Sequence, residues 1–371
     1  KLSDEYVKKM LPKFRKKYRV LKYGKDINPF TGTPVSELFE DINGDFDEEL
    51  ATVILTDPFS LNAQNKYLQL NCYYKTASLV FYDREYLSWK IDKMTIGKYH
   101  ISQVLEDYVQ SLNNLWIESD IKRKSDYKIT LEKFDFFIKD IRDKMNQLNR
   151  SIQKVVDYKH MGEGFRHKIL SSIDVKVCPY CNRQYITTYS VGKDIRSTSD
   201  LDHFYPKSAF QLYSLAILNC IPACTICNSR FKKARKLRIQ YPFEEGFEKN
   251  AIFKIKPKRK ADLNSLIGNN VDFDLILEVD NSYVDNMKIK GNIEMFRLEE
   301  VYQSHKGFVQ ELLLKNKAHP KAYKKMIEEL LKIDLTDEEL NLFLYGFSGN
   351  EKELLNKPLS KLTFDILDVF K

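Results

Sequence analysis

The sequence predicts an α+β fold that is mostly helical, with a small β-containing module in the middle of the chain. Glycine and proline are scarce, with 13 and 11 among 371 residues, and a chain poor in these two residues favours helices. Apolar residues recur at helical spacing in both end regions, whereas the middle contains paired cysteines and short runs of β-forming residues. We therefore expect a mostly helical region over 1–165, the central module over 166–245, and an α+β region over 246–371 that ends in helices.

The composition is that of a folded chain with a modest basic excess. Hydrophobic residues make up 43% of the chain, which is enough for a packed core, and the formal net charge is +8. This charge is compatible with a nucleic-acid partner, but also with a soluble protein that happens to be basic. No apolar run approaches the roughly 20 residues that a membrane-spanning helix needs, and the N-terminus has no secretory signal pattern. We expect a cytoplasmic protein without a membrane partner.

The region 1–165 begins with a basic segment of helical character. Residues 131–157 repeat apolar positions every three or four residues, which predicts a long amphipathic helix, and residues 102–118 show the same spacing. The apolar face of 131–157 would either pack within its own domain or bind a partner. The region as a whole would dock a partner or shape a substrate channel.

The region 246–371 begins with three short runs that we interpret as strands, AIFKIK at 251–256, FDLILEV at 273–279 and MKIKGNI at 287–293. The spacing of apolar residues then predicts amphipathic helices to the end of the chain. These helices are expected near residues 297–316, 320–333, 336–346 and 359–370.

The middle of the chain contains two C-x-x-C motifs, Cys178-Pro-Tyr-Cys181 and Cys224-Thr-Ile-Cys227, with 42 residues between them. Two such motifs complete a tetrahedral four-sulfur zinc site without an open position. This zinc would be structural, and it would hold together a segment too short to keep its own shape. Two separate surface motifs, or a redox-active pair, are the alternatives, and the pairing favours zinc.

The other two cysteines are interpreted as structural. Cys220 lies four residues before Cys224 and could compete as a zinc ligand, but a buried free thiol is the simpler interpretation. Cys72 is expected in the core. The crowding of five cysteines into residues 178–227 is typical of metal binding in a reducing cytoplasm, and not of a secreted disulfide scaffold.

Between the motifs lies Asp202-His203, followed by Asn219, and Asn228 stands directly after the last cysteine. A hydrolase of phosphodiesters needs a base for water and a hard divalent cation. His203 can be the base, because its ordinary pKa lies near neutrality. Asp202 would point to the opposite side of an extended strand and could face the cation. The side-chain oxygen of Asn228 is a suitable ligand for magnesium.

The segments VCPYCNRQY (177–185), DLDHFYPKS (200–208) and NCIPACTICNSRFKK (219–233) resemble the zinc-supported HNH (ββα-metal) endonucleases. More narrowly, they resemble the nuclease subunits of bacterial anti-phage systems of the Septu and retron type, which are usually encoded beside an SMC-like ATPase. YPFEEGF at 241–247 and KPLSKLTFDIL at 357–367 are a weaker part of this resemblance.

The resemblance implies a role for each of these residues. His203 would be the general base, Asp202 and Asn228 would bind the catalytic metal, and Asn219 would buttress the loop and orient His203. Asn228 stands where many members have histidine, which favours Mg²⁺ or Mn²⁺ over softer metals. The expected products carry 5′ phosphate and 3′ hydroxyl groups.

The implied local fold is a β-hairpin followed by a helix. The hairpin would pair YITTYSV (185–191) with the strand that ends at DLDHF, and GKDIRSTS (192–199) would connect them. The helix would begin near Cys224 or Cys227 and continue through the basic residues that follow.

The segment SRFKKARKLR (229–238) contains six positive charges directly after Asn228. A solvated basic face is one interpretation, and contact with a phosphate backbone is the other. We expect phosphate contacts, with two further basic residues from the central module. The expected nucleic-acid contacts are Arg183, Lys207, Arg230, Lys232, Lys233, Arg235 and Lys236, and Arg238 completes the basic run.

Together these features predict a metal-dependent endonuclease that hydrolyses DNA, with an ATPase partner in anti-phage defence. Three alternatives stay open. The same site could cleave tRNA or another structured RNA, because phosphodiester chemistry does not distinguish the two polymers. The chain could instead be a zinc-dependent binding module without catalysis, or an interaction subunit that is inert without its partner.

Overall fold

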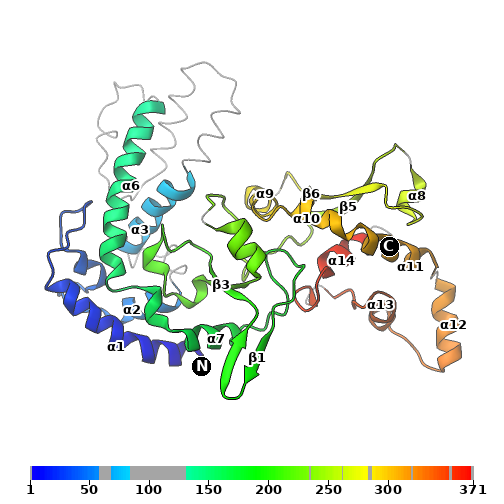
Figure 1. The fold of residues 1–371 in the computed structure, drawn as a ribbon, viewed down its shortest axis with the longest axis horizontal. Coiled ribbons are helices and arrows are strands. Elements are labelled where there is room, and N and C mark those ends of the chain that lie inside the picture. The colour runs from blue at the N-terminus through cyan, green and yellow to red at the C-terminus, as the bar shows by residue number, and fades with distance from the viewer. Residues whose placement is uncertain are drawn as a thin grey trace. The chain divides into compact units, whose positions relative to one another are not determined.

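A computed structural model describes residues 2–57, 68–83, 131–233, 235–260, 262–282, 286–318, 321–350 and 353–368. The fold is α+β and mostly helical, with small antiparallel sheets, which confirms the predicted class (Figure 1). The helix predicted near 102–118 lies outside the described residues.

Contacts divide the chain into two compact units. The first unit comprises residues 1–172 and 202–221, and the second comprises residues 173–201 and 222–371. The division falls within strands β3 (Asp200–His203) and β4 (Cys220–Ala223), which form a two-stranded sheet. The division into three functional regions at 165 and 245 stays a prediction.

The first unit is helical. Its elements are α1 (Leu2–Lys22), η1 (Val35–Phe39), α2 (Glu48–Thr56), α3 (Leu68–Ser78), the π-helical η4 (Leu79–Asp83), α6 (Leu131–Gln153), η6 (Tyr158–Met161), α7 (Glu163–Ser172), η7 (Gln211–Tyr213) and η8 (Ile217–Asn219). The predicted amphipathic helix over 131–157 is confirmed by α6. Its apolar residues from Ile138 to Ile152 are at most 2% exposed, so this part of the apolar face packs within its own unit.

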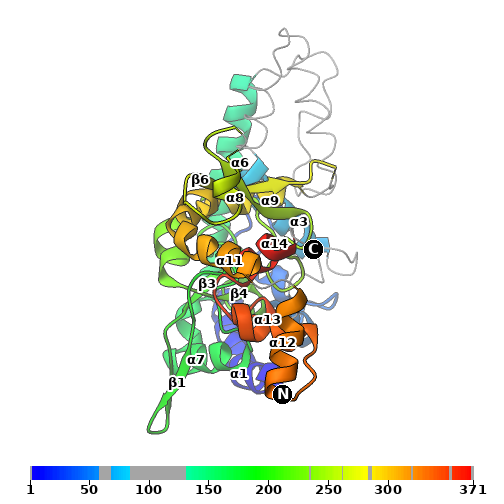
Figure 2. The same cartoon turned by 90° about the vertical axis from the view of Figure 1, so that its right-hand side faces the viewer.

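The second unit carries the sheets and the C-terminal helices. Its elements are β1 (Thr188–Val191), β2 (Asp194–Ser197), the π-helical η9 (Ile226–Lys232), β5 (Ala251–Pro257), α8 (Leu263–Leu266), β6 (Phe273–Val279), α9 (Asn286–Met295), α10 (Leu298–Tyr302), η10 (Gln303–His305), α11 (Lys306–Ala318), α12 (Lys321–Leu331), α13 (Asp337–Tyr345) and α14 (Ser360–Asp368). Two predicted strands are confirmed, because β5 pairs antiparallel with β6, from Ala251 opposite Val279 to Pro257 opposite Phe273. Both views show α14 beside α11 and this sheet (Figures 1 and 2). The predicted C-terminal helices are also present.

One predicted strand is wrong. Residues 287–293 lie in helix α9, and not in a strand. The buried residues Ile289, Asn292 and Met295 are three positions apart, which places them on one face of a helix. Asn292 also fixes the helix against the preceding chain, because its side-chain oxygen accepts a hydrogen bond of 2.8 Å from the backbone N–H of Gln240.

The predicted hairpin is wrong in its pairing. Strand β1 pairs with β2, from Thr188 opposite Ser197 to Val191 opposite Asp194, and β3 pairs with β4 instead. The segment expected to be a connection therefore contains a strand. A two-residue turn closes the β1–β2 hairpin, and its first residue, Gly192, has a φ of +61° that glycine adopts without strain.

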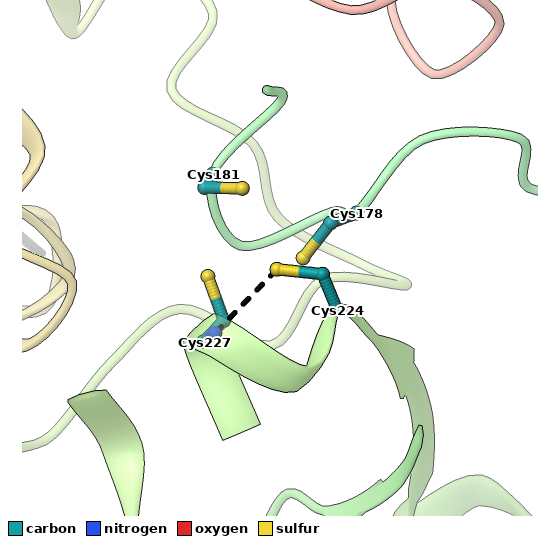
Figure 3. A group of neighbouring side chains, drawn as sticks. All are labelled: Cys178, Cys181, Cys224 and Cys227. Carbon is teal, nitrogen blue, oxygen red and sulfur yellow. Dashed lines mark hydrogen bonds between the residues drawn. The ribbon is translucent and has the colours of Figure 1, made fainter. Parts of the chain in front are cut away.

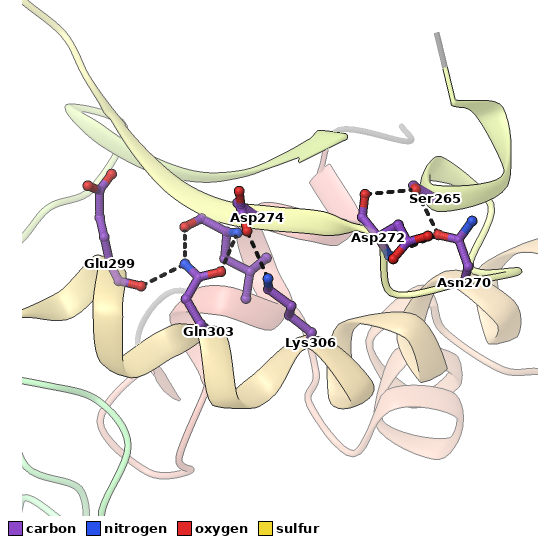
Figure 4. Close-up of polar contacts among 8 residues, drawn as sticks. Ser265, Asn270, Asp272, Asp274, Glu299, Gln303 and Lys306 are labelled. Atoms are coloured by element: carbon purple, nitrogen blue, oxygen red, sulfur yellow. Dashed lines mark hydrogen bonds and ion pairs between the residues drawn. The ribbon is translucent and has the colours of Figure 1, made fainter. Parts of the chain in front are cut away.

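The outer edge of β6 is covered by side chains from α10 and η10 (Figure 4). The Gln303 amide accepts a hydrogen bond from Leu275 N at 3.2 Å and donates one to Leu275 O at 2.7 Å. Glu299 accepts from Leu277 N at 2.9 Å, and Lys306 pairs with Asp274 at 2.8 Å. These contacts satisfy backbone groups that an exposed edge strand would offer to another chain.

We expect Gly291→Ala to destabilise the second unit. An added Cβ at Gly291 would lie 1.9 Å from the carbonyl oxygen of Arg238, so α9 or its neighbour must shift, at a cost of about 1–3 kcal/mol or more. Gly307→Ala is the matched control, because nothing lies within 4 Å of that Cβ. Urea denaturation should show a lower midpoint for Gly291→Ala alone, and equal midpoints would contradict the packing described here.

Candidate metal centre and histidine site

The four cysteines of the two C-x-x-C motifs come together in the second unit. Cys178, Cys181, Cys224 and Cys227 are all buried, and their sulfur atoms lie within 4.8 Å of one another (Figure 3). Such a group could hold a metal ion such as zinc, since four sulfur ligands suit a tetrahedral ion. The interpretation of two motifs that never meet is therefore wrong.

Local backbone contacts shape each motif. In the first, Asn182 N donates to Cys178 O at 2.8 Å, and Asn182 takes a left-handed φ of 48° that closes the turn. In the second, Asn228 N donates to Cys224 O at 3.0 Å as η9 begins. The Cys227 backbone N–H also donates to the Cys224 sulfur at 3.5 Å (Figure 3), and such a bond favours the thiolate that a metal needs.

Cys220 is a buried thiol outside this cluster, as predicted. Its side chain is fully buried, and its Sγ donates to Ala216 O at 3.3 Å. Burial raises the pKa of Cys220 to about 12, so the thiol is neutral and unreactive near neutral pH. Cys72 is 5% exposed and lies in the core of the first unit, also as predicted.

His203 and Asp202 lie in the first unit, and both are buried, with 8% and 5% of their surface exposed. The His203 Nε2 lies 3.0 Å from the carbonyl oxygen of Ser214. A carbonyl can only accept, so Nε2 donates this bond. With Nε2 engaged as a donor, Nδ1 is the ring nitrogen that a general base would have to use.

Asn219 ties together the loop that follows His203. Its side chain is fully buried, and its Oδ1 accepts a hydrogen bond of 2.8 Å from Tyr205 N. Its Nδ2 donates to Tyr205 O at 3.1 Å and to Tyr213 O at 3.0 Å. This is the geometry expected of a residue that buttresses the loop. Its effect on the orientation of His203 stays a prediction.

Two residues beside His203 were not predicted as site residues. The Tyr158 ring lies edge-on to the His203 imidazole, with 4.6 Å between ring centres. The guanidinium of Arg166 lies 4.1 Å from the centre of the Tyr158 ring, and the Lys207 ammonium lies 4.8 Å from it. The Arg166 Nε is buried and has no hydrogen-bond partner among the residues that the structure describes.

The charge of Arg166 also affects the pKa of the buried thiol of Cys220. Negative charge on Asp202 further raises the pKa of Cys220, and positive charge on Arg166 lowers it. No motif spacing signals Tyr158 or Arg166, because η6 and α7 precede the motifs in sequence and approach them only in the folded chain.

A cavity of about 460 Å³ opens in the first unit on the side of Tyr158 and Lys207. Its lining residues are Asn146, Asn149, Arg150, Gln153, Asp157, Tyr158, Lys159, Lys207, Ser208 and Gln211. Arg150, Lys159 and Lys207 supply positive charge against the single carboxylate of Asp157. A cavity of this charge and amide content suits an anion.

Asn228 lies in the second unit, where its Nδ2 donates to Asp200 Oδ2 at 3.1 Å. This bond fixes the amide and leaves its oxygen for a hard cation. Asp200 was not predicted as a site residue, although it belongs to the same D-L-D-H motif and contacts Asn228.

The basic run was expected to lie in one helix, but the structure does not show one helix there. The π-helical η9 ends at Lys232, and residues 235–240 have no regular structure. Arg230 and Lys233 are exposed, but Lys232 is only 2% exposed and its ammonium lies 5.7 Å from the Tyr180 ring. Lys232 is therefore not available as a surface contact in this structure. Lys236 is half-buried.

Two of the three arginines predicted to contact nucleic acid, Arg183 and Arg235, have protein partners. Arg183 donates from Nε to His305 Nε2 at 2.9 Å. Burial of His305 lowers its pKa below the usual value, and the positive charge of Arg183 lowers it further. Arg235 donates to Met295 O at 3.1 Å. Arg183 and Arg235 thus contribute to packing in the second unit, and their role in binding stays a prediction.

Comparison of the chain with protein-family models, curated proteins and solved structures gives no match. Among the described residues, no helix is both long enough and apolar enough to cross a membrane.

We expect Cys224→Ser to lose the metal and Cys220→Ala to retain it. Both cysteines are buried, but only Cys224 belongs to the four-sulfur cluster. Elemental analysis should find about one zinc per chain in the wild type and in Cys220→Ala. Thermal denaturation should show that a chelator lowers the stability of these two proteins only. Metal retained at full stoichiometry in Cys224→Ser would contradict the assignment of these four cysteines as metal ligands.

Proposed function

We propose that the protein is a metal-dependent endonuclease of the HNH kind. The observation that carries this proposal is the setting of His203, a buried histidine whose Nε2 proton is fixed by Ser214 O. His203 Nδ1 would take a proton from water as the water attacks phosphorus. Two cations around Tyr158, those of Arg166 and Lys207, would offset the negative charge that develops on the phosphate oxygens.

The four-cysteine cluster would hold a structural zinc, and a second ion, Mg²⁺ or Mn²⁺, would serve catalysis. The sequence resemblance alone supports Asp202 and Asn228 as ligands of the second ion, and both residues offer hard oxygen atoms. The hydrogen bond from Asn228 to Asp200 is compatible with this role, because it uses the amide nitrogen. When bound, such an ion acts as a Lewis acid on the phosphate and stabilises the leaving oxygen.

The proposed substrate is nucleic acid, and DNA before RNA. Support comes from the cavity beside Tyr158, which presents Arg150, Lys159 and Lys207 where a phosphate backbone could lie. The exposed Arg230 and Lys233 would add contacts from the second unit. An SMC-like ATPase partner and a role in anti-phage defence are proposed on the sequence resemblance alone.

His203→Ala should reduce cleavage by about 10²–10⁴-fold, because the general base is lost. The purified chain would be incubated with supercoiled plasmid and, separately, with total tRNA, in Mg²⁺ or in EDTA. His160→Ala is the control, since it removes a half-buried histidine from the same unit. Cutting of tRNA but not of plasmid would assign the site to RNA, and cutting that survives in His203→Ala would refute the assigned base.

Reversal of the cavity's charge should weaken nucleic-acid binding. Arg150→Glu with Lys159→Glu removes two exposed cations of the cavity. The slope of log Kd against log salt should fall by about two, at about one per lost phosphate contact. The matched control is Lys16→Glu with Arg19→Glu, which makes the same charge change on the exposed face of α1. Fluorescence anisotropy with a labelled duplex in EDTA measures binding apart from cleavage. Equal slopes for both double variants would exclude the cavity as a phosphate site.

A further inference from the structure

A second cavity of about 460 Å³ lies in the second unit, between the first C-x-x-C motif and residues 240–248. Its lining is rich in aromatic side chains, and this size and character are typical of sites for small ligands or single side chains. The aromatic lining residues are Tyr180, Phe243, Phe247, Phe253, Tyr302 and Phe364. The YPFEEGF segment, which the proposed nuclease chemistry does not use, supplies much of the lining.

Two hydrogen-bond acceptors in this lining have no partner among the described residues. They are Gln240 Oε1 and Glu245 Oε2, and both atoms are buried. Gln240 is 2% exposed, and its Nε2 donates to Gly246 O at 3.1 Å. That bond fixes which end of the amide faces Gly246, because an oxygen there would oppose the carbonyl. Glu245 uses its other oxygen, Oε1, to bind Lys288 at 2.9 Å.

A buried acceptor without a partner costs free energy, so a ligand that donates hydrogen bonds would be favoured here. The charge of the lining selects the ligand further. Glu244, Glu245 and Glu248 supply carboxylates, and Lys361 is the one cation among the lining residues. The Lys361 ammonium is already bound to Glu248 O and to Asp365. An anionic ligand such as a nucleotide is therefore disfavoured, and a cation is favoured.

We propose that this cavity binds the guanidinium group of an arginine side chain from a protein partner. A guanidinium is planar, always charged, and carries five N–H donors in a fixed fork. Its several N–H groups match a lining that offers more than one acceptor without a partner, and aromatic rings of the lining would cover its faces. A lysine ammonium lacks the planar face and is more strongly hydrated. The proposal does not depend on the proposed nuclease activity.

The test uses the full chain and ligand-observed NMR titration. The probe is N-acetyl-arginine N-methylamide, and the comparison ligand is the citrulline counterpart, which has nearly the same shape without the charge. We expect the arginine probe to bind about tenfold more tightly than citrulline, as expected for hydrogen bonds to charged groups. Spermidine and adenosine are titrated in parallel, to represent a free polyamine and an unpaired nucleobase.

Glu245→Gln should weaken binding of the arginine probe about tenfold. Glu294→Gln removes the same charge from an exposed residue of the second unit that does not line the cavity, and it should leave the affinity within about twofold of the wild type. Lys288→Gln breaks the Glu245 ion pair but keeps the carboxylate, so binding should persist. Loss of binding in Lys288→Gln as well would show that local folding, and not the acceptor, decides the effect.

Other outcomes would overturn the proposal. Equal affinity for the arginine and citrulline probes would exclude recognition of the charge. Spermidine binding as tightly as the arginine probe would assign the cavity to a free polyamine, and adenosine binding that depends on Glu245 would assign it to a nucleobase. A lack of binding at 10 mM arginine probe, a concentration on the order of the weakest dissociation constants expected for such a contact, would also overturn the proposal. The polar groups of the cavity would then simply be solvated.

Discussion

The second unit depends on the meeting of four sulfur atoms from two distant motifs. The turn of the first motif is bonded beyond the cluster, since Tyr302 donates to Cys181 O at 2.7 Å and the Asn182 side chain donates to Leu354 O. The second motif begins η9. Helix α10, the segment around Leu354 and η9 are therefore linked through one cluster. An ion bound by the four cysteines would make these segments fold together, because metal binding is coupled to folding.

In the first unit, buried hydrogen bonds hold separate parts of the chain together. Asn219 makes three bonds to the backbone around it, and Ser214 O sets the tautomer of His203. A buried amide that is fully bonded is rigid, because any movement would leave a polar group unpaired in a setting of low dielectric. The loop from His203 to Tyr213 is thereby held in one arrangement by Asn219 and Ser214.

Local patterns were sufficient for much of the fold and for part of the site. The helical period predicted α6 and the C-terminal helices, and motif spacing predicted the cluster of cysteines, since both are encoded within a few residues. The failures required information from distant residues. MKIKGNI folds as α9 because Gly291 allows the helix to approach the carbonyl of Arg238 and Asn292 binds Gln240. Likewise, Tyr158 reaches His203 and Arg166 reaches Tyr158 only through packing of η6 and α7. The cavity beside residues 240–248 combines residues from several separate segments of the chain.

The two cavities favour ligands of opposite charge, a difference that the net charge of +8 does not indicate. The cavity of the first unit has three cations and amide side chains around one carboxylate, and it suits a polyanion. The cavity of the second unit has aromatic walls and unpaired acceptors, and it suits a cation. Neither cavity could serve well in the other's role, because the wrong charge would be desolvated without a partner. Because each cavity lies within one unit, the proposed phosphate site and the proposed arginine site can be tested with separate variants.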